Sequence, residues 1–152
     1  MNYYCQQQYS GNLGSSPYSI ALKGCLTTCL GEVKEFAYPG SFSNPQQTEQ
    51  LLDYTPGGLI IWSSLANIRL KLVGKVTTSS LNNYALVSTI QEGLQDPNTW
   101  AILEINNGAH FVLALGKALL GGYTISDPWT GRRTTTRDYH NNVTGCRIIG
   151  RV

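Results

Sequence analysis

The sequence has few charged residues. Asp, Glu, Lys and Arg make up 13% of the 152 residues, which is about half of the usual share. The formal net charge is only +2, and the one basic cluster, Arg132-Arg133 with Arg137, is shorter than the dense basic stripe that binds nucleic acid. We therefore expect no nucleic-acid partner and a surface built mainly from uncharged polar residues.

Long apolar runs are also missing. No stretch stays apolar over the length that a membrane-spanning helix needs. The first residues, MNYYCQQQYS, lack the charged and the apolar segments of a signal peptide. We therefore expect no membrane span and no signal peptide. This leaves three origins: a protein that stays in its cell, one released by lysis or carried in a virion, or part of a larger chain.

Cysteine is scarce, with four residues at positions 5, 25, 29 and 146. Four cysteines in a chain this long do not make the disulfide scaffold of a small secreted protein. None of them has the paired CxxC spacing of a structural zinc site. A bridge between Cys5 and Cys146 stays open, because the sequence alone cannot show whether they meet.

Apolar residues make up 41% of the chain, enough for one domain with a core over residues 1–152. Helices are expected over 24–36, from Pro45 after a cap at Asn44, around 62–70 and over 86–95. Strands are expected over 99–105, 109–116 and 121–127, and further strands in RRTTTRDY and CRIIGRV. Since the helices come first and the strands follow, the pattern predicts an α+β fold with helices segregated from an antiparallel sheet.

There are only two histidines. We interpret His140, in the polar stretch RDYHNNVTG, as a solvated loop residue. His110 begins an apolar strand just after a turn, where a histidine needs a hydrogen-bond partner. Asp127, which ends the next strand, is a candidate partner, because a carboxylate that accepts an imidazole N–H stabilises the charged ring. Taken singly, His110 is better explained as a core residue that has a hydrogen-bond partner, and Asp127 as a common turn residue before proline.

Cys25 follows Gly24 at the start of the first expected helix. A thiol at this place meets the positive end of the helix dipole and free backbone N–H groups, which favour the thiolate and can also hold an oxyanion. Cys29 lies one turn further into the helix, where a small buried apolar role is expected. The sequence therefore points to Cys25 as the candidate nucleophile.

In their order and spacing, these residues resemble the papain-like cysteine peptidases, and more narrowly the family related to the bacteriocin-processing, double-glycine peptidases. The resemblance runs from residue 3 to residue 131. It rests on Tyr4-Cys5-Gln6, Ser19-Ile20, Gly24-Cys25, Thr28, Gly58, Trp62, Gly108-Ala109-His110 and Asp127-Pro128-Trp129-Thr130-Gly131. Members of the family often carry an aspartate two residues after the upstream glutamine and a tryptophan soon after, where this chain has Gln8 and Tyr9.

The resemblance implies a papain-like fold, in which an N-terminal helical part carries the nucleophile and packs on a C-terminal antiparallel sheet. It implies Cys25 as nucleophile, His110 as base and Asp127 as the residue that orients the histidine. It also implies an upstream glutamine as oxyanion donor. Gln6 fits the spacing from the tyrosine best, and the two glutamines after it are alternatives. No cofactor and no metal are implied.

The expected function is thiol-dependent hydrolysis of peptide bonds. Relatives process leader peptides, cut cell-wall peptides, or occur in phage lysins and tail proteins. Because no transporter segment follows, we expect a peptidoglycan substrate and a phage-encoded protein that acts at the cell wall. A leader-peptide or protein-processing peptidase is one alternative, and a catalytically silent peptide- or wall-binding module with the same fold is another. A zinc site made by Cys25, Cys29 and His110 is a further alternative that lacks a clear fourth ligand.

Overall fold

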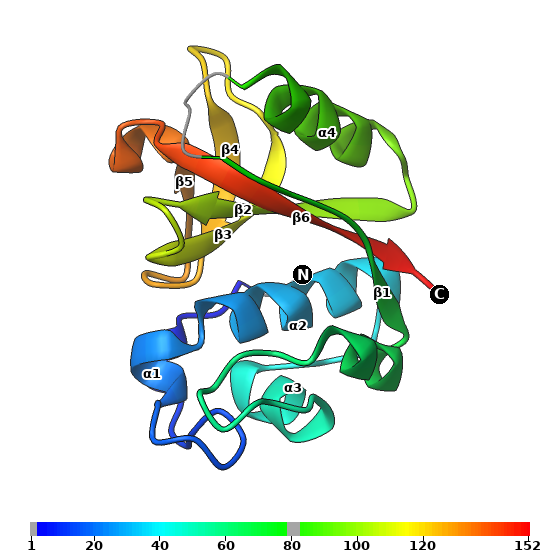
Figure 1. The fold of residues 1–152 in the computed structure, drawn as a ribbon, viewed down its shortest axis with the longest axis vertical. Coiled ribbons are helices and arrows are strands. Elements are labelled where there is room, and N and C mark those ends of the chain that lie inside the picture. Colours follow the sequence, from blue (N-terminus) through cyan, green and yellow to red (C-terminus); the bar gives the residue numbers. More distant parts are fainter. Residues whose placement is uncertain (1–2, 79–82) are drawn as a thin grey trace.

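An antiparallel sheet organises the chain in the computed structural model, which describes residues 3–78 and 83–152 (Figure 1). Its six strands lie in the order β1-β6-β2-β3-β4-β5. They are β1 (Leu70–Thr77), β2 (Thr99–Ile105), β3 (His110–Lys117), β4 (Tyr123–Asp127), β5 (Arg132–Thr135) and β6 (Val143–Arg151). The last strand therefore lies inside the sheet, between β1 and β2.

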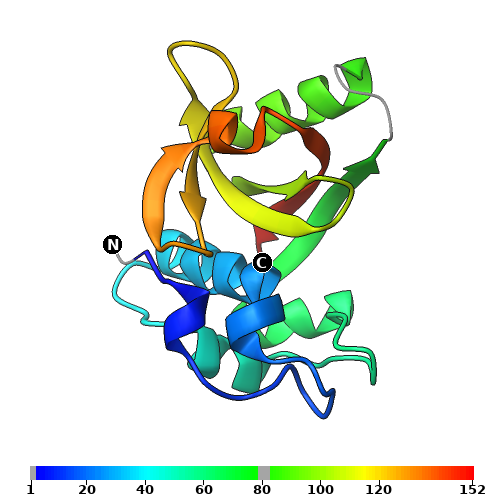
Figure 2. The same ribbon diagram turned by 90° about the vertical axis from the view of Figure 1, so that its left-hand side faces the viewer.

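The helices cover both faces of this sheet. The α-helices are α1 (Ile20–Lys23), α2 (Cys25–Ala37), α3 (Pro45–Leu51) and α4 (Tyr84–Gln95), and the 3₁₀ helices are η1 (Gln6–Gln8), η2 (Trp62–Ile68) and η3 (Thr136–Tyr139). Figures 1 and 2 show α1, α2 and α3 on one side of the sheet and α4 on the other. The α+β class is thus confirmed, with helices on two sides rather than one. No helix in the described ranges is long and apolar enough to cross a membrane.

Each face of the sheet has its own apolar core. On the α2 side, Cys29, Leu30 and Val33 pack with the strand residues Ile102, Leu113 and Ile149. On the α4 side, Leu86 and Ile90 pack with the strand residues Leu103, Val112 and Ile148. Neighbouring strand residues therefore point into different cores, which explains why β2 and β3 are mostly apolar along their length.

Local start and stop signals place most helices correctly. α2 begins at Cys25 and ends before Tyr38, as the sequence predicts. α3 begins at Pro45 after a capping box, in which the Asn44 side chain accepts from the Gln47 N–H and the Gln47 side chain accepts from the Asn44 N–H. α4 ends before Asp96 as expected.

The prediction of a third helix around 62–70 is wrong in two respects. The segment forms only the 3₁₀ helix η2, which is followed by Arg69 in the left-handed region at φ 61°. Leu70–Thr77 is then a strand that pairs with β6. This partner lies at the other end of the chain, so the local apolar pattern did not reveal the strand. The expected order of helices first and strands afterwards is corrected accordingly, because β1 precedes α4.

Gly31 gives a test of the packing between α2 and α3. In a helix interior, alanine is normally more favourable than glycine by about 1 kcal/mol. Here a Cβ would run into the Ser43 carbonyl oxygen and Thr48 Oγ1. We therefore expect Gly31→Ala to lower the free energy of unfolding by about 1–3 kcal/mol, measured by denaturant unfolding.

Gly93 in α4 supplies the matched control. Its added Cβ would approach only the Ile148 side chain, with Cδ1 at 2.7 Å, and that side chain can rotate away. Gly93→Ala should therefore be milder than Gly31→Ala. Equal stability of Gly31→Ala and the unchanged protein would contradict the close approach of α2 to the segment before α3.

Candidate active site

A cleft of about 670 Å³ lies where the helical side meets the start of β3. Its lining comes from segments that are far apart in the sequence. They include Tyr18, Leu22, Lys23, Cys25, Leu26, Gly58, Leu59, Ile60, Ala109, His110, Phe111, Trp129 and Tyr139. Cys25 and His110, the first residues of α2 and β3, thus share one cavity.

Local structure fixes Cys25 at a helix start. The short helix α1 is capped by Ser19, whose Oγ accepts from the Leu22 N–H at 3.2 Å. Gly24 then joins α1 to α2, and a Cβ there would lie 2.5 Å from the Ile20 carbonyl oxygen. The close turn requires glycine and puts Cys25 at the first position of α2, partly exposed in the cleft. The first N–H groups of a helix have no partner within it, so they are available to a ligand at this end.

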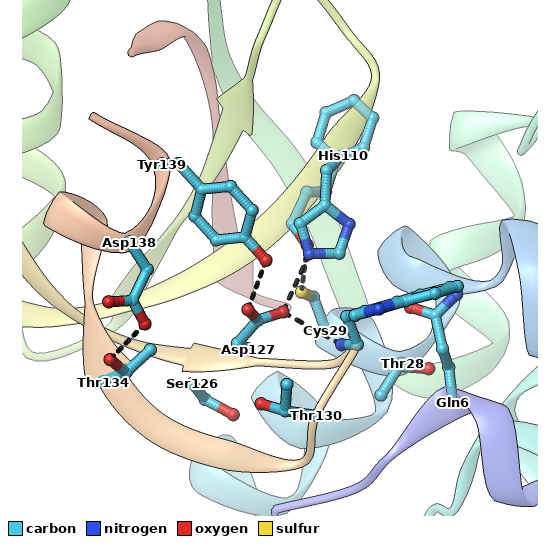
Figure 3. Close-up of polar contacts among 12 residues, drawn as sticks. Gln6, Thr28, Cys29, His110, Ser126, Asp127, Thr130, Thr134, Asp138 and Tyr139 are labelled. Carbon is cyan, nitrogen blue, oxygen red and sulfur yellow. Dashed lines mark hydrogen bonds and ion pairs between the residues drawn. The ribbon is translucent and has the colours of Figure 1, made fainter. Parts of the chain in front are cut away.

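His110 and Asp127 meet across neighbouring strands. β3 and β4 pair with Leu113 opposite Ser126, which brings the start of β3 beside the end of β4. His110 Nε2 and Asp127 Oδ1 are 2.8 Å apart. Figure 3 shows the imidazole and the carboxylate pointing toward each other. The predicted pair is therefore present.

Two further donors hold the Asp127 carboxylate. The Trp129 backbone N–H donates to Oδ1 at 2.9 Å, and the Tyr139 hydroxyl donates to Oδ2 (Figure 3). The Tyr139 ring also packs beside the His110 ring, with centroids 5.5 Å apart. Both carboxylate oxygens are thus occupied, so the carboxylate has a fixed orientation toward the histidine.

These contacts keep the pair charged near neutral pH. Burial alone would lower the pKa of His110, but its hydrogen bonds with Asp127 and Cys25 raise that pKa to about 9. Burial alone would raise the pKa of Asp127, but hydrogen bonds from His110, Tyr139 and the Trp129 N–H hold it below its usual value. Asp127 engages Nε2, so Nδ1 is the ring nitrogen that remains for another partner. His110 therefore has Asp127 as one side-chain hydrogen-bond partner and Cys25 as a second.

Gln6 is the buried member of the three adjacent glutamines. Its backbone N–H donates to the Pro128 carbonyl at 2.7 Å, and its Nε2 donates to the Ala21 carbonyl at 3.2 Å. Its Oε1 has no hydrogen-bond partner among the described residues. Gln7 and Gln8 are exposed. Gln6 thus connects the N-terminal arm, here residues 3–9, with the loop after Asp127 and with the helix that precedes Cys25.

Sequence reasoning missed Tyr139. It lies in the polar stretch where only its neighbour His140 had been considered, and His140 is exposed, as expected. No local feature marks Tyr139, because its role depends on η3 folding back over β4. The Trp129 side chain lines the cleft but stays 39% exposed, and its backbone N–H makes the direct contact with Asp127.

The other cysteines have structural surroundings. All four thiols are free, so the Cys5–Cys146 bridge that the sequence left open is absent. Cys29 is fully buried, as expected, and burial raises its pKa. Within residues 3–78 and 83–152, no three His, Cys, Asp or Glu side chains are grouped so that they could hold a metal ion. Cys25, Cys29 and His110 therefore do not form the alternative zinc site.

Comparison of the sequence with protein-family models and with curated proteins found no match.

Asp127→Asn tests the electrostatics of the pair. Asparagine keeps the size of the side chain but removes the charge, so we expect the pKa of His110 to fall from about 9 toward or below its ordinary value of 6.5. NMR titration of the His110 ring measures this, with His140→Gln to assign the two histidines. An unchanged His110 midpoint would contradict a charged pair.

The same shift predicts how stability depends on pH. Because folding raises the pKa of His110, protonation of this ring stabilises the fold fully below about pH 6.5. This contribution is lost as the pH rises through about 9. The slope of the melting temperature over this window should therefore be smaller in Asp127→Asn than in the unchanged protein.

Proposed function

We propose that the chain is a papain-like cysteine peptidase in which Cys25, His110 and Asp127 form the catalytic triad. The observation that carries the proposal is His110, which shares one cleft and a hydrogen bond with Cys25 and contacts the buried Asp127 at 2.8 Å. The position of Cys25 at the start of α2 supports it further, because helix N-termini favour thiolates.

In the proposed mechanism, the Cys25 thiolate attacks the carbonyl carbon of a peptide bond. The oxyanion that forms is held by free N–H groups at the start of α2 and by the second N–H of Gln6 Nε2. His110 gives its Nδ1 proton to the leaving amine as the C–N bond breaks and a thioester forms. His110 then takes a proton from water, whose oxygen attacks the thioester. The C–S bond breaks and Cys25 leaves as thiolate.

Asp127 serves this cycle by keeping the imidazole in one orientation and by stabilising its charged form. Tyr139 supports Asp127 by donating to the oxygen that faces away from His110. Since both groups act through His110, their removal should lower the rate without removing the nucleophile.

For the substrate, we propose cell-wall peptides, cut by a phage-encoded lysin or tail-associated protein. Stem peptides of the wall carry free carboxylates, and Lys23 in the lining of the cleft supplies a complementary charge. A leader or protein peptide is the second candidate, favoured by the apolar wall of the cleft. That wall includes Leu22, 67% exposed, and Leu59, 71% exposed, which an apolar substrate side chain would cover.

The deciding experiment incubates the protein with purified peptidoglycan and, separately, with a leader peptide that contains Gly-Gly, followed by mass spectrometry. We expect new termini from peptidoglycan, and none with Cys25→Ala or His110→Ala. Cleavage of the leader peptide alone would support a peptidase but contradict the proposed cell-wall substrate. If the protein binds either material but releases no new amine over hours, the result would favour a binding module over an enzyme.

Thiol labelling separates the nucleophile from the other cysteines. Cys29 and Cys146 are buried, while Cys5 and Cys25 are both partly exposed. Cys5 donates to the Trp129 carbonyl at 3.4 Å, whereas Cys25 adjoins His110. We expect iodoacetamide at neutral pH to modify Cys25 far faster than Cys5, as located by peptide mapping. Similar rates at these two thiols would remove the support for a catalytic Cys25.

Gln6→Ala tests the oxyanion donor. We expect it to lower turnover by about 10²-fold, the scale of one lost oxyanion donor. The alkylation rate of Cys25 should change little, since the thiol and His110 remain. Gln7→Ala is the matched control, because Gln7 is exposed and its side chain donates only to the Trp129 carbonyl. Equal losses in the two variants would argue against Gln6 as the donor.

A further inference from the structure

A buried carboxylate lies under the candidate active site and has no part in the proposed mechanism. Glu32, two turns after Cys25 in α2, is 0% exposed. Burial raises its pKa to about 7, with the nearby carboxylates Glu35 and Asp127 adding to that effect. No cation pairs with it among residues 3–78 and 83–152. A carboxylate in such surroundings is unfavourable unless its hydrogen bonds compensate for lost hydration.

The hydrogen bonds of Glu32 reach two other segments. Its Oε2 accepts from the Tyr4 backbone N–H at 2.9 Å, and its Oε1 accepts from Ser126 Oγ at 2.7 Å. Tyr4 stands two residues before Gln6 in the N-terminal arm, and Ser126 directly precedes Asp127 in β4. One side chain thus joins the three segments that carry the proposed nucleophile, oxyanion donor and orienting residue.

We infer that Glu32 is a positioning residue that fixes the N-terminal arm and the end of β4 relative to α2. Through these two contacts it holds Gln6 and Asp127 in place around Cys25 and His110. The catalytic importance of Glu32 rests on the proposed function. The link between the three segments rests only on the two hydrogen bonds just described.

The chemistry of the two partners explains why the residue is acidic. A backbone N–H and a hydroxyl are both donors, and a carboxylate offers two oxygens that accept in different directions. A glutamine keeps the Tyr4 contact, because its Oε1 accepts from the Tyr4 N–H. It keeps a contact with Ser126 in the reverse direction, because its Nε2 donates to Ser126 Oγ. A leucine fills the space but removes both contacts, and the hydroxyl of the buried Ser126 then loses the acceptor that Glu32 provides.

Glu35 shows what is particular to Glu32. It also contacts the arm, since its Oε2 accepts from the Tyr4 hydroxyl at 2.5 Å and from the Ser43 N–H at 3.2 Å. These contacts tie the arm to the segment before α3. Of the two neighbouring acids, Glu32 is the one that hydrogen-bonds to β4.

The test compares Glu32→Leu with Glu32→Gln in the full chain. Amide hydrogen exchange should rise in a peptide that covers residues 3–9 and in one that covers residues 123–129 of Glu32→Leu, while amides of β2 and β6 stay protected. With the cleaved peptide as substrate, kcat should fall by about 10²-fold or more, the scale of one lost oxyanion donor, with little change in KM. Glu32→Gln should show amide exchange and a kcat close to those of the unchanged protein.

Glu104→Gln controls for the general loss of a buried acid. Glu104 is also buried, but it pairs with Arg147 at 3.2 Å and accepts from Thr144 Oγ1, away from the arm. This variant should leave exchange in residues 3–9 unchanged. If Glu32→Leu does not fold, Ser126→Ala removes the β4 contact alone and should raise exchange only in residues 123–129.

The inference would be overturned by Glu32→Leu with unchanged exchange in both peptides, or by Glu32→Gln as impaired as Glu32→Leu. Uniform loss of protection across β2 and β6 would also overturn it, by showing a general structural role. Amide hydrogen exchange and the alkylation rate of Cys25 can both be measured without any catalytic turnover. An unchanged protein that cleaves neither test material therefore refutes the proposed function, while the exchange data still decide whether Glu32 holds the two segments.

Discussion

The packing of α2 against the sheet is the interaction on which the rest of the structure depends. Cys29, Leu30 and Val33 meet Ile102 and the other core residues of β2, β3 and β6 on that face. Because Cys25 begins the same helix and His110 begins β3, this apolar contact sets where the thiol lies relative to the imidazole. The chemistry of the cleft therefore depends on a core that contains none of the three proposed catalytic residues.

The few charges of this chain are concentrated where they have structural effects. Four of the nine acidic side chains, Glu32, Glu35, Glu104 and Asp127, are buried. Asp127 is compensated by an imidazolium and two neutral donors, and Glu104 by Arg147. Glu32 and Glu35 instead accept from backbone and hydroxyl groups. Each buried acid therefore connects segments that are separate in the sequence.

Local signals account for the parts of the fold that were predicted correctly. The cap at Asn44, the turn before His110 and the strand pattern over 99–105 depend on residues a few positions apart, so they are visible in the sequence. The 62–70 segment was misread, because it forms the 3₁₀ helix η2 and a strand, β1, begins at Leu70. The pairing of β1 with β6, at the far end of the chain, is not visible in the local pattern. The helices on both faces of the sheet were likewise missed, because burial of α4 depends on strands that follow it.

The sequence by itself determined the helix start at Cys25, the strand start at His110 and the strand end at Asp127, because glycines, turn residues and apolar runs define these boundaries locally. The resemblance to the papain-like peptidases also implied a role for Gln6. Only the tertiary structure decided that Tyr139 holds Asp127, that the four thiols stay free and that Glu32 joins the arm to β4. These contacts link residues from separate elements. They form only when the two apolar cores pack the helices against the sheet.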